Sequence, residues 1–225
     1  MAAHTVDTCI VDGISERQSA CWNTGIYDRG AQRRTDMIQT KEDLKRYLAA
    51  DYGRTELGIK GRTLRGRLCR EPYYLFWRYI RALRMEEYHT SQDGAWHKLM
   101  HYWWRRRRNL LGEKTGLWIE PGSCQEGLLV WHPNVIVPAN ARVGKNCTFH
   151  GNNVIGNDGG NGAAATIGDN ADFGIGSSVI GRVELADSVR IGAGAVVIRS
   201  CTETGAVLAG VPARQLSKNR SEMTT

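Results

Sequence analysis

Histidine is the residue type in this sequence best suited to take a proton from a hydroxyl group, because its ordinary pKa of about 6.5 lies near neutral pH. The chain has six histidines. His132 and His150 are 18 residues apart and directly follow two bulky residues, Trp131 and Phe149. In a structure that repeats every six residues they would stack at one corner of successive coils, with backbones about 4.8 Å apart. We therefore expect one to act as a general base and the other to contact a substrate.

Metal and thiol chemistry find less support in the sequence. His97 and His101 are four residues apart, as two zinc ligands on a helix would be, but neither a third ligand nor an H-E-x-x-H arrangement accompanies them. The six cysteines stand singly, without a C-x-x-C pair, which is typical of reduced structural thiols. No cysteine or serine stands beside a histidine in a recognisable nucleophile motif. We expect no bound metal and no covalent enzyme intermediate.

A six-residue repeat runs through the second half of the chain and predicts the element that positions these histidines. Ten of eleven residues taken at every sixth position are apolar, whereas the 41% hydrophobic composition predicts about four or five. Small residues and glycines stand near the repeated position, as the tight corners of a parallel β-helix require. The exception, Asn161, lies in GNDGGNGAAA, which we interpret as a loop extruded from one corner. The repeated positions are Val137, Val143, Phe149, Ile155, Asn161, Ile167, Phe173, Val179, Leu185, Ile191 and Val197.

The first half of the sequence predicts an α-helical domain over residues 37–115. Thr40-Lys41-Glu42-Asp43 forms a variant capping box, and Glu71-Pro72 can open a second helix. A third helix follows Gly94, with apolar residues at helical spacing. The β-helix is predicted for residues 116–204 and a tail with GVPAR for 205–225. Residues 1–36 show no persistent period and are expected to be a poorly ordered extension, or an upstream start before Met37. The apolar stripe of the third helix is Trp96, Leu99, Trp103 and Leu110.

The formal net charge of +7 comes from the helical half. The first 116 residues hold 22 Lys and Arg against 14 Asp and Glu, and the remainder holds 8 against 9. Successive helical residues are about 100° apart, so Arg105, Arg106, Arg107 and Arg108 would encircle a helix and not form one face. We expect a solvated or carboxylate-paired helix end. CoA phosphates, a nucleotide-linked acceptor and an anionic surface remain open as partners of the arginines.

The composition also argues against several classes of function. No nucleic-acid recognition motif accompanies the positive charge, so nucleic-acid binding is not expected. No apolar run reaches the roughly 18 residues that a membrane helix needs. The first residues lack the basic start and apolar stretch of a secretory signal. These observations favour a cytoplasmic protein.

Four segments carry a resemblance to the hexapeptide-repeat acyltransferases, specifically the serine acetyltransferase family. They are VGKNCTFHGNNVIGN, TIGDNADFGIGSSVIGRVELADSVRIGAGAVVIRS, AGVPAR and MIQTKEDLKRYLAAD, the last of which is similar to a branch found with polysaccharide-biosynthesis enzymes. The resemblance implies that the β-helix is left-handed, that the protein is a homotrimer, and that acetyl-CoA is the co-substrate. It implies direct transfer of the acetyl group to a hydroxyl.

The resemblance also implies roles for individual residues. In GLLVWHPNVIV, His132 matches the family's general base. The residue that orients this histidine is chosen by position and not by the resemblance, because the family's aspartate falls near Trp118: Glu120, about one coil earlier, is the first candidate, and Glu126 the second. Small residues would let pantetheine approach the backbone, and basic residues would bind phosphate. The implied CoA contacts are Gly176, Ser177, Gly194, Ala195, Arg214 and Lys218.

Two departures from the family bear on the acceptor. Where the cysteine-biosynthetic branch has an aspartate before the base and Arg-His-Pro at the end of the loop, this chain has Trp131 and the run 163–165, which is all alanine. These departures favour a sugar or glycan-precursor hydroxyl over L-serine, with Trp131 as a platform for the sugar ring. The serine alternative stays open, because a site could be rebuilt from Asn152, Asp158 and arginines of the helical domain. An amino-sugar N-acetyltransferase and a non-catalytic trimeric β-helix are the further alternatives.

Overall fold

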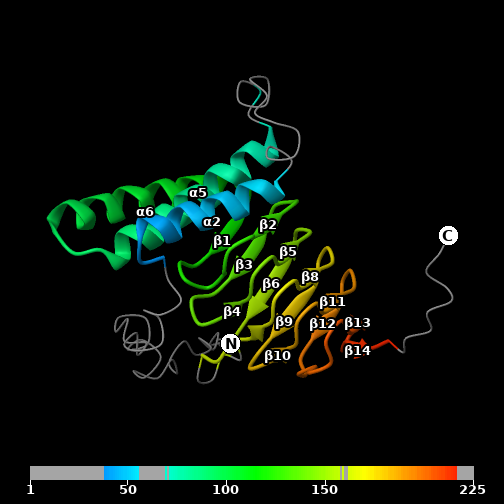
Figure 1. Cartoon of the computed structure of the whole chain (residues 1–225). Helices are drawn as coiled ribbons and strands as arrows, with labels where there is room; N and C mark the ends of the chain where they lie inside the picture. Colours follow the sequence, from blue (N-terminus) through cyan, green and yellow to red (C-terminus); the bar gives the residue numbers. More distant parts are fainter. Residues whose placement is uncertain (1–37, 56–68, 70, 158, 160–161, 217–225) are drawn as a thin grey trace, which may run out of the picture. The chain divides into compact units, whose positions relative to one another are not determined.

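A computed structural model describes residues 38–55, 69, 71–157, 159 and 162–216 of the chain. Three helices come first: α2 (Lys41–Arg54), α5 (Pro72–Ser91) and α6 (Ala95–Thr115). Strands β1 to β14 follow as a stack of coils, and the helices lie together at the end of the stack that holds β1 (Figure 1). The extension predicted for residues 1–36 lies outside the described residues.

Local sequence explains where the helices begin and end. The Asp43 N–H donates to the Thr40 hydroxyl over 3.0 Å and the Asp43 carboxylate accepts the Thr40 N–H over 3.1 Å, so the predicted capping box is present. Pro72 stands in the first turn of α5, where a missing N–H costs nothing. Gly116 ends α6 in the left-handed region at φ 68°, which glycine adopts without strain. The chain turns there directly into β1.

The strands form three sheets that are parallel except for one terminal pair. Their orders are β1-β3-β6-β9-β12, β10-β7-β4 and β14-β13-β11-β8-β5-β2, with β13 and β14 antiparallel. Successive coils contribute short strands to the three sheets in turn, which is the arrangement of a parallel β-helix. The bounds are β1 Leu117–Ile119, β2 Leu129–Val130, β3 Val135–Val137, β4 Arg142–Val143, β5 Thr148–Phe149, β6 Asn153–Gly156, β7 Thr166–Ile167, β8 Asp172–Phe173, β9 Ser178–Ile180, β10 Glu184–Leu185, β11 Arg190–Ile191, β12 Val196–Val197, β13 Val207–Ala209 and β14 Arg214–Gln215.

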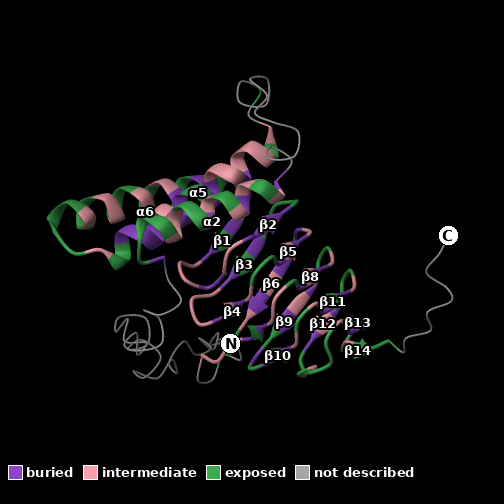
Figure 2. Cartoon of the chain, in the orientation of Figure 1, coloured by how far each residue is buried: buried purple, intermediate pink, exposed green. Residues whose placement is uncertain are grey.

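The predicted six-residue repeat is confirmed by burial. Every apolar member of the series is at most 5% exposed, and buried positions recur along the coils in Figure 2. Phe149 stacks on Phe173 with ring centroids 4.4 Å apart. Strand pairs on either side of one coil are offset by 17 to 19 residues, whereas the pairs that span that coil, such as Val143 with Ile167, are offset by 24. The extra residues lie between β6 and β7, where the loop was predicted. Asn161 itself lies outside the described residues.

The arginine run of α6 is divided in the structure. Arg108 is buried, with its Nε 2.6 Å from a Glu86 carboxylate oxygen, and it donates to the Ile119 carbonyl over 2.9 Å. Arg105 and Arg106 are exposed and Arg107 is partly exposed. Among the described residues, the predicted carboxylate pairing holds for Arg108 and not for the other three arginines, and Arg108 lies within the helix, not at its end.

The apolar stripe predicted for the third helix does not pack into the core. Trp96, Leu99, Trp103 and Leu110 are all exposed, and α6 instead buries Arg108, Leu111, Gly112 and Thr115. The helical spacing marked the helix correctly, but it could not show which side faces the protein.

Two of the cysteines are packing residues beneath the helices. Burial raises the pKa of the Cys124 and Cys147 thiols to about 12, so both stay protonated at neutral pH. The described cysteines, Cys69 and Cys201 included, are all free thiols. The prediction of mostly structural cysteines is thus met by Cys124 and Cys147, whereas Cys69 is exposed and Cys201 is partly exposed.

Candidate active site

The two histidines of the β-helix lie on neighbouring coils, one residue out of the register that the sequence predicted. Val130 pairs with Phe149, so Trp131 falls opposite His150 and not opposite Phe149. Val130 is the inward residue at 5% exposure, whereas Trp131 points outward at 37%. The cause is that the corner from Val130 to Val135 is one residue longer than the corresponding corner on the next coil.

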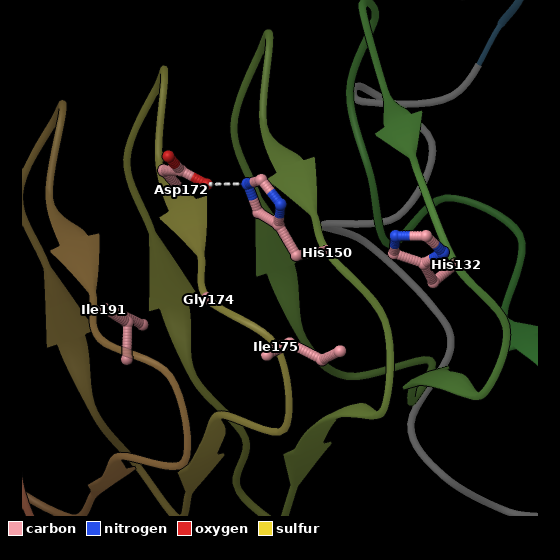
Figure 3. A pocket seen from close by; sticks show the side chains of 6 residues that line it. All are labelled: His132, His150, Asp172, Gly174, Ile175 and Ile191. Atoms are coloured by element: carbon pink, nitrogen blue, oxygen red, sulfur yellow. Dashed lines mark ion pairs between the residues drawn. The ribbon is translucent and has the colours of Figure 1, made fainter.

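A cavity of about 290 Å³ brings both histidines together (Figure 3). The side chains of Asp172, His150 and His132 follow one another along three successive coils. The cavity combines imidazole and carboxylate groups with a partly apolar wall, as sites for small polar ligands do. Its lining residues are His132, His150, Asp172, Gly174, Ile175 and Ile191.

Asp172 is a site residue that the sequence reasoning missed. Its Oδ1 lies 2.8 Å from Nε2 of His150, and the two side chains are 44% and 41% exposed, so solvent and a ligand can reach the pair (Figure 3). An offset of 18 residues from His150 leads to Gly168. The extruded loop changes the local offset to 24, so that Thr148 and Asp172 are the paired positions. The sequence did contain a signal for this: adding the six extra residues of the predicted loop to the 18-residue offset gives the pairing of Thr148 with Asp172.

The carboxylates proposed to orient His132 do not lie beside it. Ile119 pairs with Val137, so Glu120 stands beyond the end of β3, whereas His132 precedes its start. Glu126 is engaged elsewhere, with oxygens 2.7 Å from Nε of Arg46 and 3.2 Å from Nζ of Lys145. Within the described ranges, His132 has no hydrogen bond or ion pair.

Asn152 and Asp158 are the remaining residues that were predicted to bind the acceptor. Asn152 lies near the site, and Asp158 lies outside the described residues. Asn152 adopts φ 52° at the corner beside His132, and its Oδ1 accepts a hydrogen bond from Asn134 over 2.9 Å. Its side chain does not line the cavity.

The implied CoA contacts separate into exposed and buried positions. Gly176 and Gly194 stack at one corner of successive coils with left-handed φ values of 71° and 66°, and both are exposed. Ser177 and Ala195 are completely buried, so they fill the interior of the corner and do not face a ligand. Arg214 is exposed in β14, and Lys218 lies outside the described residues.

The end of α2 lies against the coil that carries His150. Arg54 donates to the carbonyl oxygens of Gly127 and Cys147 and, over 2.9 Å, to the Thr148 hydroxyl. Burial lowers the pKa of Arg54, while the nearby carboxylate of Asp172 acts in the opposite direction. The helical region therefore helps to fix the backbone next to the cavity.

The described part of the chain also bears on metal ligands and on membrane-spanning helices. No group of three or more His, Cys, Asp or Glu side chains there is arranged to hold a metal ion. His89 and His97 approach to 2.9 Å between their Nδ1 atoms, while His101 instead contacts the Thr90 hydroxyl. Across the same residues, none of the helices has the length and hydropathy of a membrane span.

Comparison with known proteins identifies the family. No protein-family profile matches the chain. The serine acetyltransferase of Helicobacter pylori is 33% identical over 131 residues, which cover 56% of this chain and 76% of that protein. The chain belongs to the serine acetyltransferase family. The Mycobacterium tuberculosis serine acetyltransferase is 29% identical over 152 residues, covering 62% of this chain and 66% of that protein.

Solved structures of the same family agree on the fold. Soybean serine acetyltransferase without ligand superposes with a TM-score of 0.57 at 20% identity, over 78% of this chain and 69% of that one. A serine acetyltransferase in complex with CoA gives 0.56 at 16% identity, over 78% and 70%. The fold is therefore a left-handed β-helix that follows a helical region, as the sequence predicted. The match with the Synechococcus elongatus relative, by contrast, spans 44% of that protein, so this chain aligns with less than two thirds of some serine acetyltransferases.

Proposed function

We propose that the protein transfers an acetyl group from acetyl-CoA to the hydroxyl of a small acceptor, with L-serine as the first candidate. The observation that carries this proposal is the cavity in which His132, His150 and Asp172 meet, in a chain of the serine acetyltransferase family. Acetyl-CoA is supported by the CoA-bound relative of similar fold. The homotrimer and the cytoplasmic location remain proposals as well.

The relatives favour the serine alternative over the sugar acceptor that the sequence alone favoured. All three curated relatives are named serine acetyltransferases, and none supports the polysaccharide-associated branch. The sugar hypothesis arose because partners for a zwitterion were missing. Asp172 and His150 offer such partners in this proposal: a carboxylate oxygen of Asp172 accepts from the ammonium of serine, and His150, with both ring nitrogens protonated, donates its second N–H to the carboxylate of serine.

In the proposed mechanism, His132 takes the proton of the acceptor hydroxyl as its oxygen attacks the thioester carbonyl carbon. Collapse of the tetrahedral adduct breaks the C–S bond, and the proton passes from His132 to the leaving CoA thiolate. In this proposal pantetheine approaches the backbone at the exposed corner of Gly176 and Gly194, and the exposed Arg214 binds a CoA phosphate. We also propose that the helical domain spans residues 37–115 and the β-helix acyltransferase domain residues 116–204.

The test is CoA release by the purified chain with acetyl-CoA and separate acceptors: L-serine, sugars, sugar nucleotides and amino sugars. We expect release with L-serine, and an O-acetyl ester as product. Asp172→Asn is expected to raise the KM for serine about tenfold or more and to leave the KM for acetyl-CoA unchanged, because a charged partner of the ammonium is lost. Asp93→Asn, on the loop before α6, is the matched control.

Three results would decide against the serine proposal. CoA release with a sugar, but not with L-serine, would favour the sugar-acceptor hypothesis instead. An amide product from an amino sugar would identify an N-acetyltransferase. Absence of both CoA release and acetyl-CoA binding would favour a non-catalytic β-helix.

Gly151 supplies a second prediction at this site. It adopts φ 109°, and an added Cβ would lie 2.5 Å from the Cβ of His132. Gly151→Ala is therefore expected to displace His132 and lower kcat about 10- to 100-fold, since a displacement near 1 Å costs that much at a positioned group. Gly205→Ala is the control, because Gly205 has φ 72° and nothing within 4 Å of an added Cβ. Equal losses of kcat in both variants would mean that backbone strain, not His132, is responsible.

A further inference from the structure

The outward side of α6 carries a continuous band of exposed apolar side chains, which we call the α6 stripe. Trp96 is 64% exposed and Tyr102 is 66% exposed, far above what a packing face shows. At 100° per residue the members fall within about 120° of the helix circumference, so they form one face. Exposed apolar patches of this kind mark interaction surfaces. The α6 stripe consists of Trp96, Leu99, Tyr102, Trp103 and Leu110.

Cationic side chains lie within and beside the α6 stripe. By the same geometry Arg106 falls inside it, Lys98 and Arg105 along one edge, and Arg107 along the other. The Arg107 guanidinium lies 5.4 Å from the centroid of the Trp103 ring. Over the described ranges, Arg105, Arg106 and Arg107 make no ion pair, whereas Arg108 is paired with Glu86. The single acidic residue of α6 is Glu113, which by the same geometry also falls within the arc of the stripe, in the last turns of the helix.

We propose that the α6 stripe binds the surface of an anionic lipid bilayer, with α6 lying in the plane of the interface. An interfacial helix combines Trp, Tyr and Leu on one face with Lys and Arg beside them, so that the rings enter the headgroup region and the cations meet lipid phosphates. The α6 stripe has both features. This binding is separate from acetyl transfer, because the cavity lies on the β-helix coils.

Other occupants fit the charges less well. A contact between two copies of the stripe would gather the exposed arginines of both chains, with one α6 carboxylate from each to offset them. A nucleic acid would meet the arginines, but nothing in α6 resembles a recognition motif. A surface of lipid phosphates over an apolar layer matches both the charges and the rings.

The test is flotation of the full chain with vesicles of phosphatidylcholine alone, and of phosphatidylcholine with about one third phosphatidylglycerol. We expect binding to the anionic vesicles, weakened by added salt. Trp96→Ser should lower partitioning about tenfold, and Trp118→Ser, an exposed tryptophan on β1, should leave it unchanged. Arg106→Glu with Arg107→Glu should lower partitioning about tenfold or more, since each cation near the surface contributes several-fold. Lys41→Glu with Lys45→Glu, exposed on α2, is the charge-matched control.

Circular dichroism and CoA release check that each variant is folded. Absence of binding to anionic vesicles, or equal binding to neutral ones, would overturn the proposal. It would also be overturned if the control variants lost as much binding as the stripe variants. Sedimentation that shows a smaller assembly for Trp96→Ser, without vesicle binding by the wild type, would assign the stripe to a contact between chains. The acetyltransferase proposal is unaffected by any of these results.

Discussion

Replacing His132 with alanine is expected to lower kcat for serine acetylation by about 10²- to 10⁴-fold, the usual contribution of a general base. The side chain lines the cavity and makes no hydrogen bond within the described part of the chain, so its removal takes away proton transfer and little packing. The melting temperature and the affinity for acetyl-CoA should therefore stay close to the wild type. Steady-state kinetics, thermal unfolding and CoA binding measure the three quantities on the same preparation.

His150→Ala is the informative companion to this variant. His150 is paired with Asp172 at 2.8 Å, which resembles the way many catalytic histidines are held. In our proposal His150 binds the acceptor, so its loss should act mainly on the KM for serine. If His132→Ala kept most of its activity and His150→Ala lost nearly all of its kcat, the roles of the two histidines would be exchanged.

The coils of the β-helix were predictable because one rule repeats at every corner. An inward aliphatic every sixth residue needs no long-range information, and burial of positions such as Ile167 and Phe173 follows it directly. What the rule could not give was the exact register between coils. One additional residue before Val135 moves His132 relative to His150, and one extruded loop brings Asp172 beside His150. Errors of a single residue decide which side chains meet in a site.

The helical region was predictable as helices but not as a packing arrangement. Trp96 and Trp103 have the spacing of a buried face, yet α6 turns Arg108 inward because Glu86 and the Ile119 carbonyl satisfy its guanidinium. A charged residue can be buried only where partners from other elements converge. Those partners lie on α5 and β1, at sequence distances that no local pattern reveals.

Arg84 is the clearest case of such convergence. It is fully buried in α5, with Nε 2.8 Å from an Asp51 oxygen of α2 and Nη1 3.1 Å from a Glu87 oxygen. It also donates to the carbonyls of Cys124 and Gln125, each over 2.8 Å. Burial lowers the pKa of Arg84, but Asp51 and Glu87 outweigh it and raise that pKa, so the guanidinium stays charged. One side chain thus joins two helices to the first coil of the β-helix.

Arg84→Leu is expected to lower the free energy of unfolding by about 3 to 5 kcal/mol, because it leaves the carboxylates of Asp51 and Glu87 buried without their cation. For a chain of this size that corresponds to a fall in Tm on the order of 10 °C. Arg81→Leu, which removes an exposed arginine three residues earlier on α5, should change the stability by less than about 0.5 kcal/mol. Chemical denaturation of the two variants beside the wild type measures the difference.

The pH dependence of Arg84→Leu distinguishes an unpaired charge from lost packing. Burial already raises the pKa of Glu87 in the intact protein, and loss of the guanidinium should raise it further. A carboxyl whose pKa is higher in the folded than in the unfolded chain gains stability as the pH falls. The deficit of Arg84→Leu should therefore shrink between pH 7 and pH 5. If the loss of stability did not depend on pH, it would be due to lost packing and not to unpaired charges. If the loss were no larger than that of Arg81→Leu, the contacts of Arg84 with Asp51 and Glu87 would not be what holds the helices to the β-helix.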